Sequence, residues 1–235
     1  MISHEKKFIF VHIPRTGGTH LSEFLLPYCD EESLIFSPYA CNAKNNSLLH
    51  APILDYMDHY GDEILDYTIF TIIRNPWSRT ISQSLKHNNG KFEREHFRKV
   101  VFSPWTLGVS RHSHFNYLFN RKGVEAVRKG RSRFNYSEDY TCQYAPAATL
   151  ETMELVYEQI TWPYFLQFED YTKDVTYMLD RLDIKYDIEK LKKKTNSSVH
   201  RHYSTYFKED EIEEIRLCCA LDIQFFRYNF EKENI

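Results

Sequence analysis

The stretch FIFVHIPRTGGTHL, Phe8–Leu21, holds the strongest indication of fold in this chain. Its first residues are apolar and rich in β-forming side chains, which predicts a short buried strand over Phe8–Ile13. The residues that follow the two glycines, Thr19–Leu26, place their apolar side chains on one face and predict a helix. A strand that turns sharply through glycines into a helix predicts an α/β protein with a binding loop at this junction.

The loop between this strand and helix has the chemistry of an anion site. Free backbone N–H groups and the helix dipole attract anions, phosphates above all. Gly17 and Gly18 let the backbone approach the anion, Thr16 and Thr19 add hydroxyl donors, and Arg15 adds a permanent planar charge. The alternative is an ordinary strand–helix turn that uses glycine for geometry alone. No lysine follows the glycines, so the loop departs from the nucleoside-triphosphate signature and disfavours an ordinary ATP or GTP enzyme.

A second candidate anion site lies in TIIRNPWSRTIS, Thr71–Ser82. Arg74 follows the clearest strand of the chain, Tyr67–Ile73, and Ser78 and Ser82 share one face of the helix that comes next. In a parallel sheet the carboxyl ends of the strands form the ligand crevice, so Arg74 and Ser82 could hold a second phosphate near the first. The alternative is that Arg74 caps a neighbouring helix and both serines lie on the surface.

The rest of the chain alternates helices with strands. This alternation predicts one α/β domain over residues 1–235, with a mostly parallel sheet flanked by helices. Glu169 is expected to cap a helix, and residues 190–202 are expected to form a basic loop. The remaining predicted elements are a strand at Tyr164–Phe168 and helices at Ile53–Tyr60, Pro76 to about Lys86, Phe92–Val101, Thr149–Gln159, Tyr171–Leu182 and Asp210–Leu221.

Composition narrows the classes of function. A net charge of −3 with 42% hydrophobic and 16% aromatic residues describes a globular protein without a basic field, so no nucleic-acid partner is expected. Five cysteines, an odd number with no C-x-x-C pair, disfavour a disulfide scaffold and a zinc site. The chain has no signal-peptide pattern at its start and no apolar run approaching ~18 residues, which predicts a soluble cytoplasmic protein without a transmembrane segment.

The two loops together resemble the cofactor motifs of sulfotransferases that use 3′-phosphoadenosine 5′-phosphosulfate (PAPS). The segment FVHIPRTGGT, Phe10–Thr19, is similar to their loop for the 5′-phosphosulfate, and Arg74 with Ser82, eight residues on, is similar to their pair for the 3′-phosphate. The resemblance spans roughly residues 8–230, is patchy between about 88 and 140, and is closest to the carbohydrate branch with the heparan sulfate 2-O- and 6-O-sulfotransferases. The segments that carry this last likeness are His50-Ala51-Pro52, Phe168-Glu169-Asp170 and Asn196–Tyr206.

This resemblance implies a P-loop-like fold and transfer of a sulfuryl group from PAPS to an acceptor hydroxyl on a glycan, with the product PAP and without a metal. It implies that His50 is the general base and that Arg15 stabilises the leaving phosphate. It also implies a set of residues that contact the cofactor: Arg15, Thr16, Gly17, Gly18, Thr19, Arg74, Ser82, Ser198 and Arg201.

Several features keep alternatives open. Arg15 stands where the family usually has lysine, as in some tyrosylprotein-type relatives, and arginine cannot give up a proton. The eukaryotic carbohydrate enzymes are anchored in the Golgi, so a Golgi location requires that this chain be trimmed from a longer one. A lone histidine such as His50 is more often structural. Ser198 and Arg201 are nearly as consistent with a solvated basic loop, and the basic stretch 111–133 is consistent with either acceptor binding or a solvated insertion. A catalytically silent module that binds PAP and a glycan, and a phosphate-transferring kinase, are the alternative functions.

Overall fold

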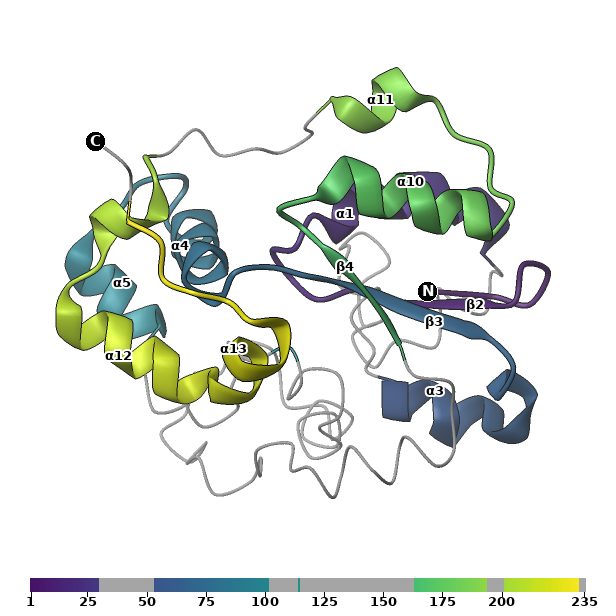
Figure 1. Cartoon of the computed structure of the whole chain (residues 1–235), viewed down its shortest axis with the longest axis horizontal. Helices are drawn as coiled ribbons and strands as arrows, with labels where there is room; N and C mark the ends of the chain where they lie inside the picture. The colour runs from purple at the N-terminus through teal and green to yellow at the C-terminus, as the bar shows by residue number, and fades with distance from the viewer. Residues whose placement is uncertain (30–52, 102–113, 115–162, 194–200, 233–235) are drawn as a thin grey trace.

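The computed structural model describes residues 1–29, 53–101, 114, 163–193 and 201–232, and its described strands form one four-stranded sheet in the order β1-β2-β3-β4 (Figure 1). Strands β2 (Phe8–Val11), β3 (Thr68–Ile73) and β4 (Tyr164–Gln167) are parallel to one another, and β1 (Ile2–Ser3) pairs antiparallel with β2. The predicted α/β class with a mostly parallel sheet is therefore confirmed. The prediction missed β1, because two residues are too few to show a period.

The described α-helices follow the predicted ones closely, with two differences, and the three short 3-10 helices were not predicted. The predicted basic loop begins with a short helix, α11, because the Asp187 carboxylate caps it by accepting from the N–H groups of Glu189 and Lys190. The predicted helix Asp210–Leu221 is interrupted at Cys219, so two helices replace one. The predicted helix Thr149–Gln159 lies outside the described residues. The observed helices are α1 (Gly18–Leu25), η1 (Leu26–Tyr28), α3 (Ile53–Tyr60), η3 (Gly61–Ile64), α4 (Pro76–His87), α5 (Arg94–Val101), α10 (Tyr171–Arg181), α11 (Ile188–Lys192), η5 (Tyr203–Tyr206), α12 (Glu209–Cys218) and α13 (Ala220–Phe226).

Helices cover both faces of the sheet, which explains why its central strands are apolar without alternation. On one face, Phe10 and Phe70 stack at 5.2 Å between ring centroids and pack against α1 and α10. On the other face, Val11 and Ile69 pack against α3, with residues of α13 at the border of the same cluster. The two pairs of helices lie on opposite sides of the sheet in Figure 1. A parallel sheet buried on both faces is the expected consequence of strand–helix–strand connections.

A third apolar cluster joins α4, α5 and α12 beside the sheet. Trp77 of α4 is fully buried in it, and its indole N–H donates to the Ile212 carbonyl at 3.1 Å. Phe97 of α5 and Ile215 of α12 complete the contact between the three helices. This cluster holds the C-terminal helices against α4, the helix that follows Arg74.

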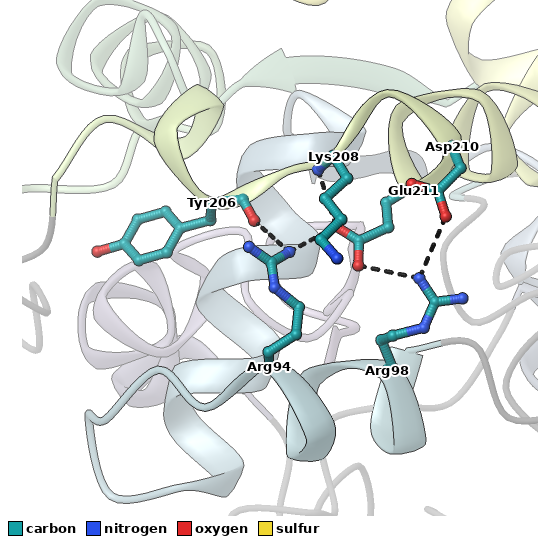
Figure 2. A network of polar contacts seen from close by, with 6 residues as sticks. All are labelled: Arg94, Arg98, Tyr206, Lys208, Asp210 and Glu211. Atoms are coloured by element: carbon teal, nitrogen blue, oxygen red, sulfur yellow. Dashed lines mark hydrogen bonds and ion pairs between the residues drawn. The ribbon is translucent and has the colours of Figure 1, made fainter.

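A buried carboxylate ties α5 to α12. Glu211 has no exposed surface, and its carboxylate accepts from Arg94 at 2.6 Å, from Arg98 at 3.1 Å and from the Lys208 N–H at 2.9 Å. Figure 2 shows both arginines reaching from α5 towards this carboxylate, with Asp210 beside the second of them. The carboxylate thus closes the first turn of α12 and receives two guanidinium groups at the same time.

The three parallel strands end at one edge of the sheet, and the residues that follow them meet there. The loop of residues 12–17 follows β2, Arg74 follows β3, and Phe168 follows β4. The backbone pairing continues past the strands, because the Phe168 N–H donates to the Ile73 carbonyl at 2.8 Å. The edge therefore brings together three segments that lie far apart in the sequence, as expected for the ligand crevice of a parallel sheet.

Candidate functional site

A pocket of about 1130 Å³ opens at this edge of the sheet. Segments that follow all three parallel strands line it, together with parts of α4, α10, α11 and the chain after α13. The predicted site residues that lie on its wall are Arg15, Gly17, Thr19, Arg74, Ser82 and Arg201. The structure thus brings the two predicted anion sites into one pocket.

The glycine loop turns sharply into α1 through two left-handed residues. Gly17 precedes α1 with φ +86°, and Arg15 is also left-handed at φ +69°, a conformation that costs an arginine about 1–2 kcal/mol. Within the described residues, the backbone N–H groups of residues 15–19 donate to no carbonyl. Unpaired amides at the start of a helix form a positive end that stabilises an anion.

Two residues of this loop face inward. The Thr16 hydroxyl is fully buried and donates to the Ile13 carbonyl at 2.8 Å, which differs from the expectation that it faces a ligand. Gly18 packs against the ring of His12, so closely that an added Cβ would lie 2.2 Å from the His12 Cδ2 atom. Both residues therefore shape the loop from behind, while Thr19 remains on the pocket wall.

Substituting Gly18→Ala tests this packing. We expect the free energy of unfolding to fall by about 1–3 kcal/mol, because the new methyl group forces the His12 ring out of the space beneath the loop. Urea denaturation measures this loss. The double variant His12→Ala/Gly18→Ala should recover part of it, since the clash partner is gone. Gly18 does not have a left-handed backbone, so no backbone strain adds to this loss. An equal loss in Gly18→Ala and the double variant would contradict the proposed clash.

Two guanidinium groups face the pocket, and each holds a serine hydroxyl from α4. Arg15 donates through Nε and Nη2 to the Ser82 Oγ at 3.1 and 2.8 Å. Arg74 donates through the same two nitrogens to the Ser78 Oγ at 3.1 and 2.9 Å. Because each hydroxyl oxygen accepts two N–H groups, its own proton is left to donate, and the pocket is where an acceptor could lie. Ser82 thus pairs with Arg15 rather than with Arg74, the partner that the sequence suggested.

The positive charge of this site is weakly compensated. Arg74 is only 8% exposed, and burial together with the charges of Arg15 and Arg79 lowers its pKa to about 10, against the opposing pull of Glu169. Burial also lowers the pKa of Arg15. Neither Arg15 nor Arg74 forms an ion pair within the described part of the chain. Arg74, which is buried, and Arg15, which is partly buried, remain charged at neutral pH, and an anionic ligand would stabilise both charges.

The arginines also hold the backbone of the glycine loop. Arg74 donates through Nη1 to the Arg15 carbonyl at 3.1 Å, and Arg79 donates through Nε to the Pro14 carbonyl at 2.9 Å. The Phe168 ring lies 4.1 Å from the Arg74 Cζ atom and covers one face of its guanidinium plane. Arg74 is therefore held by a serine, a carbonyl and an aromatic ring, which fixes its direction before any ligand binds.

Glu169 has a different role from the predicted one. Its Oε1 accepts from the Asn75 N–H at 2.8 Å, and the Tyr228 hydroxyl donates to its Oε2 at 3.4 Å. Asp170, the residue that precedes α10, makes no capping bond with its side chain. The prediction that Glu169 caps this helix is therefore wrong, because its carboxylate joins the strand end beside Arg74 instead.

The wall of the pocket beside the glycine loop is aromatic. The rings of His20 and Tyr171 stack at 5.8 Å with an angle of 11° between their planes, and the Tyr171 hydroxyl donates to the Gly17 carbonyl at 3.4 Å. Further cations that line the pocket are Lys173, Lys192 and Arg201. The pocket thus combines a cationic end at the strand tips with flat rings, which suits a ligand that has anionic groups and a planar ring.

Some predicted site residues lie outside the described residues. These are His50, Ser198 and, apart from His114, the basic stretch 111–133. Arg201 is described, and its backbone N–H donates to the Tyr206 hydroxyl at 3.2 Å while its side chain lines the pocket. The general-base assignment therefore stays a prediction.

Three residues that contribute to the site were not predicted as site residues from the sequence. Ser78 was recognised only as a residue on the face of Ser82, and the spacing of four was the available signal. Phe168 shows its role only when β4 lies beside β3, because its ring then covers Arg74. His20 follows the glycine loop directly, and its stacking with Tyr171 depends on a contact between two helices.

Comparisons of this chain with protein-family models, with curated proteins and with solved structures found no match. Residues 1–29, 53–101, 163–193 and 201–232 hold no helix that combines the length and apolar character required to cross a bilayer. The same residues bring together no group of three or more potential metal ligands. The function proposed below therefore depends on the geometry and the charge of the pocket.

Proposed function

We propose that this protein is a PAPS-dependent sulfotransferase with a P-loop-like fold and that its acceptor is a hydroxyl group on a carbohydrate. One observation carries the proposal. Two guanidinium–serine pairs, Arg15 with Ser82 and Arg74 with Ser78, face one pocket from adjacent strand ends without an ion-pair partner among the described residues. A ligand with two phosphate groups could place one of them on each pair.

The residues of the pocket fit the donor nucleotide in a specific way. The unpaired amides of residues 15–19 and the Arg15 guanidinium would hold the 5′-phosphosulfate, and Arg74 with Ser78 would hold the 3′-phosphate. Lys173 and Arg201, which also line the pocket, would add positive charge near the nucleotide. The volume of about 1130 Å³ leaves room for an acceptor group beside the nucleotide.

Bound PAPS supplies an activated sulfuryl group, and its transfer breaks the sulfur–oxygen bond to the 5′-phosphate as the acceptor oxygen forms the new one. Arg15 and the loop amides would stabilise the charge that develops on the departing phosphate oxygen, and such stabilisation is usually the largest contribution to the rate of these transfers. His50 would accept the proton of the acceptor hydroxyl as the general base. Arg74 would not act on the reacting atoms but would anchor the far phosphate, so that attack occurs in line.

Two measurements test this proposal. PAP should raise the melting temperature of the protein more than an equal concentration of ATP does, because only PAP carries the 3′-phosphate that Arg74 and Ser78 would bind. Transfer of radiolabelled sulfate from PAPS to a panel of glycans, phenols and peptides should label glycans. A larger shift with ATP would favour a kinase, and labelling of phenols alone would overturn the carbohydrate assignment.

Substituting His50→Ala separates the enzyme from a silent binding module. The enzyme predicts transfer reduced by about 10²–10⁴-fold with unchanged affinity for PAP, because a general base acts on the acceptor and not on the nucleotide. A protein that binds PAP but shows no transfer with any acceptor before the substitution would support the silent module instead.

A further inference from the structure

A buried histidine–aspartate pair stands directly behind Arg74. The His114 Nε2 accepts from the Arg74 backbone N–H at 3.1 Å. The Asp222 Oδ2 of α13 lies 3.1 Å from the His114 Nδ1 and accepts from the His114 N–H at 2.6 Å. Both side chains are fully buried, so water cannot replace either contact. The pair connects α13 to the end of β3, where the pocket begins.

These contacts define the protonation state of the ring. Since Nε2 accepts a hydrogen bond from a backbone amide, it carries no proton, and the single proton of the neutral ring lies on Nδ1 and is donated to Asp222. A second proton would turn Nε2 into a donor that faces the Arg74 N–H, also a donor. The hydrogen bond to Arg74 therefore exists only with the neutral ring.

The groups around the ring favour this neutral state. Burial lowers the pKa of His114 below its ordinary value, and the charge of Arg79 on α4 acts in the same direction. The carboxylates of Asp222 and, more weakly, Glu169 oppose this shift. Beside Asp222 lies the Cys219 thiol, whose pKa is raised by burial and then by that carboxylate. The Phe226 ring covers the imidazole edge-on at 6.3 Å.

We propose that His114 and Asp222 are positioning residues that hold Arg74 in the direction required for anion binding, and that a proton on His114 releases Arg74. The inference rests on the anion pocket of the proposed function, although it does not depend on sulfuryl transfer. The His114–Asp222 pair acts on Arg74, because the buried Arg74 N–H donates to His114 and the Arg74 side chain lines the pocket. Strain at that amide moves the guanidinium that Ser78 and the Arg15 carbonyl otherwise hold.

Inorganic sulfate is the probe for this role, because its charge does not change over the pH range of histidine titration. At about pH 7.5, where the ring is neutral, His114→Gln should bind sulfate within about twofold of the unsubstituted protein, since the glutamine carbonyl can still accept from Arg74. His114→Leu keeps a similar volume without an acceptor and should bind sulfate about tenfold more weakly, the effect of one buried hydrogen bond. Isothermal titration calorimetry measures both affinities.

A pH series gives a signature that a purely structural role would not produce. The pocket also contains His12, His20 and His202, and their protonation strengthens anion binding in every variant. We therefore compare the ratio of the sulfate dissociation constants of the unsubstituted protein and His114→Gln. This ratio should rise about tenfold as the pH falls and the His114 ring takes up its proton, because only the unsubstituted protein then loses the hydrogen bond from the Arg74 N–H. NMR monitors the protonation of the ring. His87→Gln, at an exposed position near the end of α4, is the control. The ratio of the sulfate dissociation constants of the unsubstituted protein and His87→Gln should stay near one across the pH series.

Each outcome decides the inference. Equal sulfate affinity in His114→Leu and His114→Gln, or a flat ratio while the ring titrates, would overturn it. If His114→Leu does not fold, the pH series decides, and if the ring does not titrate before acid unfolding, the leucine variant decides. If His114→Leu does not fold and the ring does not titrate, Asp222→Asn decides, because it substitutes the partner of His114. The Arg74 amide resonance must then shift relative to the unsubstituted protein, and an unmoved resonance would overturn the inference. A protein that binds sulfate under His114 control but transfers nothing from PAPS would refute the proposed function alone.

Discussion

Substituting Arg74→Lys should lower the affinity for PAP about 100-fold, roughly 3 kcal/mol, without lowering the stability of the free protein. The guanidinium of Arg74 uses a fork of two nitrogens for Ser78 and a third nitrogen for the Arg15 carbonyl, and an ammonium group cannot reproduce this arrangement. Isothermal titration calorimetry with PAP and with inorganic sulfate measures the loss.

The stability of the same variant tells whether Arg74 serves binding or folding. Burial and the charges of Arg15 and Arg79 make its charged form unfavourable, with a pKa lowered to about 10. A buried lysine gives up its charge more readily than arginine, so relief of this unfavourable charge offsets the lost hydrogen bonds, and the free energy of unfolding should change by less than about 1 kcal/mol. A residue that reduces binding without supporting the fold is the signature of a functional site.

Arg181→Lys is the matched control for Arg74→Lys. The Arg181 guanidinium also lies over an aromatic ring, 4.9 Å from the ring of Tyr164, but it does not line the pocket. We expect this control to bind PAP with unchanged affinity. If Arg74→Lys binds PAP within twofold of the unsubstituted protein, or if both variants lose affinity equally, the assignment of a phosphate to Arg74 is wrong.

Substituting Glu211→Gln should lower the free energy of unfolding by about 3–5 kcal/mol, the largest effect on stability that we expect from a single substitution. The buried carboxylate accepts from Arg94, from Arg98 and from the Lys208 N–H, as Figure 2 shows. A glutamine amide supplies only one acceptor oxygen, and its NH₂ group would face a guanidinium donor. Urea denaturation followed by circular dichroism measures the change.

Asp210→Asn is the control for this substitution. Asp210 lies next to Glu211 and contacts the same Arg98 at 3.4 Å, but its side chain is exposed. Its loss should change the free energy of unfolding by less than about 0.5 kcal/mol, since exposed ion pairs are screened by water. Equal losses in both variants would show that burial does not determine the strength of this network. PAP affinity should be retained in Glu211→Gln under conditions where the variant is folded, because Glu211 does not line the pocket.

Local sequence was sufficient for the elements that carry the site. The strand over Thr68–Ile73 and the helix at Ile53–Tyr60 were predicted to within a residue, because continuous β-forming residues and apolar spacing are properties of neighbouring positions. Asn75 and Pro76 likewise predict the start of α4, and the Asn75 side chain accepts from the Ser78 N–H as a cap. The division at Cys219 was not predictable from the apolar period, which continues across it.

The pairings within the pocket could not be predicted in the same way. Ser82 was assigned to Arg74 because both lie in one motif, but it pairs with Arg15, which is 67 positions away. Glu169 was assigned to its own helix, yet it accepts from Asn75 at a separation of 94. A side chain chooses its partner after the strands have aligned, and the order of the strands is not a property of any one motif.

By itself, the sequence of this protein determined that a strand, a turn with two glycines and a helix stand in succession, and that arginine and serine residues follow the strands. Those features come from backbone preferences and periodicity, which act between residues a few positions apart. Only the tertiary structure decided that Arg15, Arg74 and Phe168 meet at one edge, and that His114 and Asp222, 108 positions apart, pair behind Arg74. The physical reason is that burial and hydrogen-bond pairing depend on which segments become neighbours in space, and the parallel sheet sets those neighbours.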